Sequence, residues 1–145
     1  MKDRKERGIL ISKVNQSNVY NVTALRRFSM KITNLDKVEK SPVTMEGATG
    51  AHRQAPLSRY DGAPNFSMRV FTLEPNGHTP FHKHPFEHLN YIIRGDGVVV
   101  VKNGEEREVH TEDFVLVLPN EHHQYKNKSA HEPFTFICAV PKEYE

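Results

Sequence analysis

The chain has 145 residues, of which 37% are hydrophobic and 26% charged, with a formal net charge of +2 and no tryptophan. This length and composition are typical of one globular domain rather than of a disordered or fibrous chain. No apolar run approaches the roughly 20 residues that span a bilayer, and no basic stripe or DNA-reading motif lies in the body of the chain. We therefore expect no membrane span and no nucleic-acid partner.

Residues 1–29 are polar, basic at the start, and contain only scattered apolar positions. They lack the sustained apolar region of a signal peptide, and the single cysteine of the chain allows no internal disulfide. We therefore expect a cytoplasmic protein. We interpret residues 1–29 as an N-terminal appendage, either a disordered tail or an over-extended start, and residues 30–145 as the folded domain.

Residues 36–60 are irregular, and we expect at most edge strands near 43–45 and 52–57, separated by a turn over 47–50. From about residue 66 onward, runs rich in β-branched and aromatic residues alternate with turn signals every 8 to 12 residues or so. These runs predict strands over 65–73, 89–94, 98–102, 107–110, 114–118, 123–126 and 134–140. The turn signals lie at 74–77, 95–97, 103–104 and 118–121. No segment after residue 60 has helical periodicity, so the pattern predicts an all-β sandwich or barrel.

The strongest hairpin signal is the pair Asn103-Gly104, which separates the run VVVVK from EEREV. A two-residue type I′ turn needs positive φ at both central positions, and Asn followed by Gly is its preferred sequence. We therefore expect a tight hairpin there.

Three of the nine histidines fall within seven residues, in the stretch HKHPFEH at 82–88. His82 and His84 are two residues apart, so both would point to the same face of a strand, and a bend at Pro85 could return His88 to that face. Protonated neighbours would repel one another, so this crowding suggests neutral imidazoles that share a metal ion. A single strand histidine is more often solvated or hydrogen bonded, but the spacing of all three favours a metal site.

A fourth ligand is expected about thirty-five residues later, from His122 or His123. Because these neighbours alternate faces on a strand, only one of them can point toward the first three, and parity leaves the choice open. We expect three other histidines, at turns or strand ends, to be solvated: His78, His110 and His131. The role of His52 stays undecided.

These stretches resemble the two motifs of small single-domain cupins, of the cupin 2 conserved barrel type. The first motif runs from a Gly through H-x-H to a Gly and is similar to GHTPFHKHPFEHLNYIIRG at 77–95; the second is similar to DFVLVLPNEHHQYKN at 113–127. The resemblance spans about residues 36–141, with both motifs inside 77–127. It implies an all-β cupin double-stranded β-helix, which is a jelly-roll barrel, and a homodimer that pairs through N-terminal strands.

The resemblance also implies a set of metal ligands. The H-x3-N spacing of the second motif selects His123, which precedes Asn127. In most cupins a Glu completes the first motif, but here His88 stands at that position and Glu87 comes one residue early. This form is similar to a subgroup whose site consists of four histidines, which implies the ligands His82, His84, His88 and His123.

Four imidazoles would leave the +2 charge of a metal ion uncompensated, which favours anions at its open positions. Imidazole suits several divalent metals, and we expect Mn or Fe, with Ni, Cu, Co and Zn as alternatives. Strand parity puts Arg69 and Phe71 on one face, which lines the pocket above the metal in similar cupins, and Arg69 could hold a carboxylate or other anion. Tyr125 and Phe136 would add an aromatic wall, unless they are ordinary core. We expect Cys138 to be a buried, inert thiol.

The resemblance implies a metal-dependent enzyme, and we expect an oxidoreductase of the dioxygenase type that acts on a small organic substrate. Its catalysis would be centred on the metal, so no single catalytic side chain is identified. Two alternatives stay open. One is a redox-neutral isomerase, epimerase or lyase that acts on a sugar or hydroxy acid; the other is a non-catalytic cupin that binds a small molecule.

Overall fold

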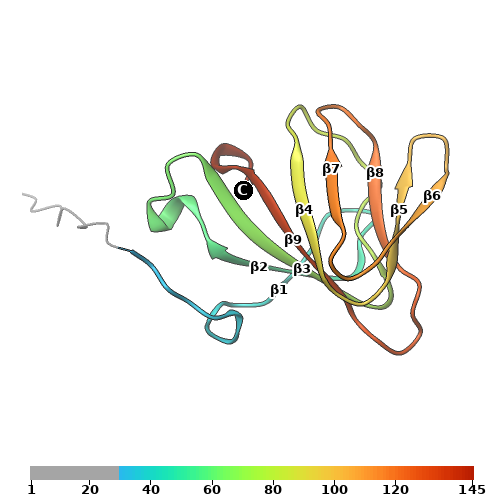
Figure 1. Cartoon of the computed structure of the whole chain (residues 1–145), viewed down its shortest axis with the longest axis horizontal. Coiled ribbons are helices and arrows are strands. Elements are labelled where there is room, and N and C mark those ends of the chain that lie inside the picture. The colour runs from blue at the N-terminus through green and yellow to red at the C-terminus, as the bar shows by residue number, and fades with distance from the viewer. Residues whose placement is uncertain (1–29) are drawn as a thin grey trace, which may run out of the picture.

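The computed structural model describes residues 30–145, which form β-strands joined by loops and three-residue 3₁₀ turns (Figure 1). The strands are β1 (Ser41–Pro42), β2 (Thr49–Leu57), β3 (Phe66–His78), β4 (His88–Arg94), β5 (Gly97–Val101), β6 (Glu106–Val109), β7 (Phe114–Val117), β8 (His123–Asn127) and β9 (Phe134–Pro141). The 3₁₀ turns are η1 (Leu35–Lys37), η2 (Arg59–Asp61) and η3 (Lys142–Tyr144). No helix of this part of the chain has the length and apolar character needed to cross a membrane. The appendage predicted over 1–29 lies outside the described residues.

The strands form one curled antiparallel sheet. Hydrogen bonding follows the order β6-β5-β8-β3-β9-β4-β7, while β2 pairs with β3 and β1 pairs with β2. Strands β3 and β9 are long and pair over eight residues, whereas β3 meets β8 only at its end, where His78 lies opposite Lys126. The sheet therefore turns a corner at the end of β3, and it closes into a half-open barrel (Figure 1). The predicted all-β jelly-roll class is confirmed.

Six of the seven predicted strands after residue 60 match the observed bounds to within one residue at each end. The exception is β3, because the turn predicted over 74–77 is a bulge in a continuing strand. The partner of β2 jumps from Leu73 to His78 across these residues, and Asn76 has a φ of 59°. The same Pro, Asn and Gly that permit a turn here permit a bulge. As a result β3 reaches the loop that carries the first histidines.

Two further expectations about local structure were wrong. The first edge strand covers Ser41–Pro42 rather than 43–45. The hairpin between β5 and β6 exists, but Gly104 (φ 81°) has positive φ and Asn103 does not. The Gly104 N–H donates to the Val101 carbonyl at 2.9 Å, so the loop has three residues and ends in a left-handed glycine, which is the next most common hairpin type.

The core lies between the two halves of the curled sheet. Its buried hydrophobic members alternate along the strands with outward-facing residues, as the period of a strand requires. They are Ala51, Leu73, Ile92, Val99, Val109, Tyr125, Phe134, Phe136, Cys138 and Val140. Full burial of one such side chain contributes about 1.5–3 kcal/mol, so this cluster supplies much of the stability that holds the site rigid.

Candidate metal centre

Backbone pairing brings the two motifs together. The His82 N–H donates to the His123 carbonyl at 3.2 Å, and the His123 N–H donates to the His82 carbonyl at 2.9 Å. The Asn120 N–H also donates to the His84 carbonyl at 2.7 Å. His82 and His84 therefore lie in a loop with one isolated β-bridge rather than on a regular strand, which corrects the expectation of strand geometry. The loop is nevertheless fixed to the start of β8.

Three imidazoles of the cluster are held in one tautomer by main-chain carbonyls. The Nδ1 atoms of His82, His84 and His123 lie 2.9, 2.7 and 2.9 Å from the carbonyl oxygens of residues 80, 86 and 121. A carbonyl only accepts, so each Nδ1 carries the proton and donates it. Each Nε2 therefore keeps a free lone pair, which is how metal-ligating histidines are usually oriented.

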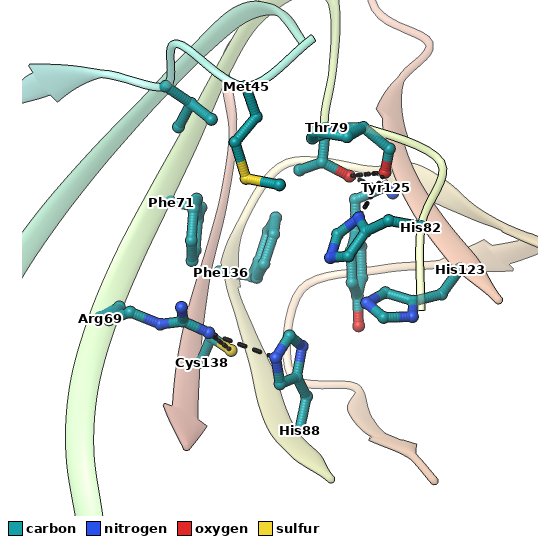
Figure 2. A pocket seen from close by; sticks show the side chains of 12 residues that line it. Met45, Arg69, Phe71, Thr79, His82, His88, His123, Tyr125, Phe136 and Cys138 are labelled. Carbon is teal, nitrogen blue, oxygen red and sulfur yellow. Dashed lines mark hydrogen bonds between the residues drawn. The ribbon is translucent and has the colours of Figure 1, made fainter. Parts of the chain in front are cut away.

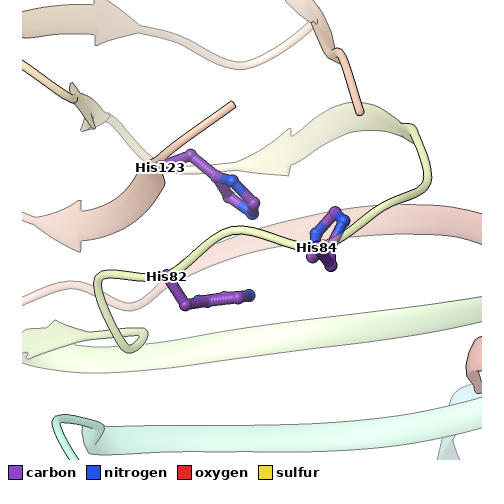
Figure 3. Close-up of side chains that lie close together, drawn as sticks. All are labelled: His82, His84 and His123. Atoms are coloured by element: carbon purple, nitrogen blue, oxygen red, sulfur yellow. The ribbon is translucent and has the colours of Figure 1, made fainter. Parts of the chain in front are cut away.

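The three histidines fit a metal ion. One ligand nitrogen from each of His82, His84 and His123 lies within 4.8 Å of the others, and their rings point toward a common centre (Figure 3). The Nε2 of His84 is buried and has no hydrogen-bond partner. An unpaired buried nitrogen is costly, and a cation between the three rings would satisfy it.

Burial favours the neutral form of three histidines of this group: His84, His88 and His123. It lowers the pKa of His123 to about 4 and that of His88 to about 2, and it also lowers the pKa of His84. In each case the main cause is loss of water around the charged imidazolium; proximity to the other histidines lowers the pKa further. Neutral imidazole is the form that binds a metal, so these three side chains need not lose a proton first.

His88 lies beside this group of three but has another partner. Its ring centroid is 3.9 Å from that of His84 and 5.2 Å from that of His123. Its Nε2 lies 3.3 Å from Nη2 of Arg69, and it does not belong to the set whose nitrogens converge within 4.8 Å. Three of the four expected ligands are thus brought together, and the fourth lies next to them at the start of β4.

The remaining histidines of the described chain lie apart from the cluster. The ring of His122 stacks on Phe81, with 5.5 Å between centroids. His110 and His131 are exposed as predicted, and His110 pairs with Asp96 at 3.0 Å. His78 is half-buried rather than solvated, and its Nδ1 lies 3.2 Å from the Thr79 carbonyl oxygen. Glu87 does not belong to the converging group either.

A cavity of about 80 Å³ opens beside the histidines, between the inner faces of β3, β8 and β9 (Figure 2). Cross-strand register builds its wall, because Phe71 lies opposite Phe136 and Arg69 opposite Cys138. The rings of Phe71 and Phe136 stack at 5.4 Å, and Tyr125 stacks on Phe136 at 4.2 Å. Tyr125 and Phe136 also belong to the buried core, so these residues are at once part of the cavity wall and part of the core.

Some lining residues were not predicted from the sequence. Val43 and Met45 reach the cavity from the irregular segment before β2, where no pattern indicated a pocket. Thr79 is buried, and its Oγ1 accepts a hydrogen bond from the Tyr125 N–H at 2.9 Å, which ties the histidine loop to β8. Cys138 is buried as expected, and burial raises the pKa of its thiol, but its sulfur lies in the cavity wall and accepts from Arg69.

Comparison with known proteins gives consistent results. The profile of the cupin domain family, Cupin_2, matches residues 69–140. A cupin 2 domain-containing protein from Halorhodospira halophila is 30% identical, with 72% of this chain and 77% of that chain covered and a TM-score of 0.60. The polyketide cyclase RemF from Streptomyces resistomycificus is 26% identical, with 78% and 80% covered and a TM-score of 0.74.

A sugar phosphate isomerase of the cupin superfamily from Silicibacter pomeroyi has the same fold at 19% identity, with 77% of this chain and 75% of that chain covered and a TM-score of 0.62. No curated protein sequence matches the chain.

Proposed function

Since the chain belongs to the cupin-2 domain family, we propose that it is a metal-dependent enzyme, an oxidoreductase of the dioxygenase type, that acts on a small organic substrate. The observation that carries this proposal is the set of three imidazoles, from His82, His84 and His123, whose ligand nitrogens converge beside an aromatic cavity. A converging set of this kind next to a pocket is more consistent with a reaction site than with a structural ion, since structural sites are closed and usually rich in cysteine.

We propose His82, His84 and His123 as ligands, with His88 as the fourth. The donor set is all nitrogen and suits Mn or Fe, and also Ni, Cu, Co or Zn. A bound Mn or Fe ion would supply Lewis acidity and the electron transfer that dioxygen chemistry requires. The chain itself supplies orientation, because the carbonyl partners of Nδ1 fix the rings of His82, His84 and His123 before any ion binds.

The proposed substrate pocket consists of Arg69, Phe71, Tyr125 and Phe136. Its stacked rings present flat apolar surfaces that would hold a small substrate in one plane and exclude water from it. The buried Arg69 adds one fixed positive charge to the pocket.

A redox-neutral reaction is the second candidate. It is favoured by the 26% identity to a structure named as a polyketide cyclase, a class of enzyme that closes rings. In that case the metal would act only as a Lewis acid, and the same ligands and pocket would be used. A cupin that binds a small molecule without turnover is the third candidate.

Oxygen consumption separates these candidates. Metal-loaded protein is mixed with a panel of small phenols, enols and organic acids, and dissolved oxygen and products are followed together. The proposed dioxygenase predicts oxygen uptake that depends on substrate, is lost in His84→Ala and is retained in His122→Ala. Product formation without oxygen uptake would favour the redox-neutral class, and metal and ligand binding without any turnover would favour the binding protein.

We also propose that the protein is a homodimer in the cytoplasm. Pairing through N-terminal strands stays a prediction, and the apolar surface supports a different interface on the outer faces of β4 and β7. There the exposed Leu89 lies opposite the exposed Leu116, and the half-buried Tyr91 lies opposite the exposed Phe114. Contiguous apolar surface of this kind usually marks an interface. The cytoplasmic location is supported by the single free cysteine, Cys138.

A further inference from the structure

Arg69 is a buried cation without an acidic partner. Only 8% of its surface is exposed, and its side chain extends from β3 along the floor of the cavity toward His88 (Figure 2). No ion pair within residues 30–145 includes Arg69. A buried charge is expensive unless an opposite charge or strong acceptors compensate it.

The groups that Arg69 does contact compensate its charge poorly. Its Nη2 lies 3.1 Å from the sulfur of Cys138 and 3.3 Å from Nε2 of His88, and its guanidinium carbon is 5.2 Å from the ring centroid of Phe71. A thiol is a weak acceptor, and a guanidinium has five N–H donors to satisfy. Its Nε is buried and has no partner at all.

A second unpartnered polar group lies in the same cavity wall. The Tyr125 hydroxyl is buried without a hydrogen-bond partner, and only 2% of the residue is exposed. A phenol is protonated at neutral pH, so this hydroxyl can donate a hydrogen bond. Among the residues that line the cavity, Arg69 and Tyr125 are the two with a buried, unpaired polar atom.

A fixed charge and a free hydroxyl donor in an aromatic cavity define the ligand chemistry. A carboxylate offers two oxygens to a guanidinium in matching planar geometry, and its charge offsets that of the arginine. The cavity volume of about 80 Å³ and the aromatic wall favour a small acid. A neutral ligand would leave the buried charge of Arg69 uncompensated.

We propose that this cavity binds a small carboxylate through Arg69 and Tyr125, and that this anion and the metal ion bind cooperatively. The carboxylate site depends only on Arg69 and Tyr125, whereas the cooperativity rests on the proposed metal site. Two positive charges would share one poorly hydrated cavity, and an anion between them is stabilised by both. His88 links the two, because Arg69 holds its Nε2 and an acid that draws Arg69 away frees this nitrogen for the metal.

Carboxylate binding is tested by titration calorimetry on the metal-free full chain. The probes are acetate, pyruvate and benzoate, with acetamide and benzamide as uncharged counterparts. We expect at least one acid to bind, the amides not to bind, and affinity to fall about tenfold or more in Arg69→Met, because a hydrogen bond to a charged group contributes roughly 1.5–3 kcal/mol. Arg94→Met, at an exposed arginine paired with Glu132, is the matched control and should bind like the wild type.

Tyr125→Phe keeps the ring and loses only the hydroxyl, so it tests the proposal even if Arg69→Met does not fold. We expect a severalfold weaker affinity for the acid in this variant, in line with one lost hydrogen bond of about 1 kcal/mol. Absence of binding by every acid, or equal affinities in wild type, Arg69→Met and Tyr125→Phe, would overturn the carboxylate assignment.

Cooperativity is measured as the affinity for Mn²⁺ or Zn²⁺ with and without a saturating acid. We expect the acid to tighten metal binding at least about fivefold in the wild type, the lower end of typical coupling between sites, and to have no effect in Arg69→Met. An affinity for the metal that does not change when the acid is added would overturn the cooperativity, while the proposed metal site would stand. Acid binding by a protein that takes up no metal would instead refute the proposed function while the Arg69 assignment stands.

Discussion

The buried histidines govern how the metal-free protein responds to acid. The pKa of His123 is lowered from 6.5 to about 4 because burial disfavours its charged form. In the unfolded chain the same side chain binds a proton near pH 6.5, so between about pH 6.5 and pH 4 the unfolded state binds more protons than the native state. Stability therefore falls as the pH falls through this window, by about 2–3 kcal/mol for His123 between pH 7 and pH 4.5.

Urea unfolding of metal-free protein at pH 7.5 and pH 4.5 measures this effect. The wild type should lose stability at the lower pH, and His123→Gln should lose about 2 kcal/mol less because glutamine does not titrate. His131→Gln, at an exposed position, is the control and should follow the wild type. An equal loss in wild type and His123→Gln would show that His123 is not kept neutral by burial.

At the residue scale, sequence spacing predicted the histidines better than the pocket around them. His82, His84 and His123 carry a spacing that is visible without coordinates, and they converge. Met45 and Thr79 carry no such signal, because they reach the cavity from irregular segments whose position depends on long-range pairing. The contact between Arg69 and Cys138 follows from the register of β3 and β9, which strand parity alone does not determine.

At the element scale, the glycine that begins β5 and the glycine in the loop after it are needed for different reasons: Gly97 leaves no room for a Cβ, and Gly104 has a positive φ. A Cβ on Gly97 would lie 2.7 Å from the Lys126 carbonyl oxygen and 2.9 Å from the Phe134 ring. Gly104 has a φ of 81° and open space around it. We expect Gly97→Ala to lower the free energy of unfolding by about 2–3 kcal/mol through overpacking, and Gly104→Ala to lower it by about 1 kcal/mol through backbone strain.

Thermal and urea unfolding of both variants measure whether Gly97→Ala loses more stability than Gly104→Ala. A Gly97→Ala variant as stable as Gly104→Ala would show that β5 and β8 are not packed as closely as described.

The elements themselves were largely predictable because a strand with one buried face alternates in sequence. The hairpin at 103–104 and the region 74–77 were less predictable, since Asn, Gly and Pro permit several backbone conformations. Pairing with β2 makes 74–77 a bulge, and a third loop residue makes the hairpin wider than a type I′ turn.

At the scale of the whole molecule, the outer face of β4 and β7 tests the proposed dimer. Phe114 is 83% exposed and lies near Leu116 and Leu89 on this face. Burial of such side chains against a second copy would remove them from water, so we expect a dimer in light scattering. The double variant Phe114→Lys and Leu116→Lys should be a folded monomer, because unpaired charges would be buried at the interface.

Tyr60→Lys changes an exposed aromatic on η2 and serves as the control that should remain dimeric. A wild type that is monomeric at micromolar concentration, or a double variant that stays dimeric, would contradict this interface.

The central claim is that His82, His84 and His123 hold a transition metal ion. The most direct test is the metal content, by mass spectrometry, of tag-free full-length protein, with wild type beside His84→Ala and His122→Ala. We predict a near-stoichiometric first-row metal in the wild type and in His122→Ala, and its loss in His84→Ala. Wild-type protein that stays metal-free after reconstitution with Mn²⁺ and Fe²⁺, or His84→Ala with undiminished metal, would contradict the claim.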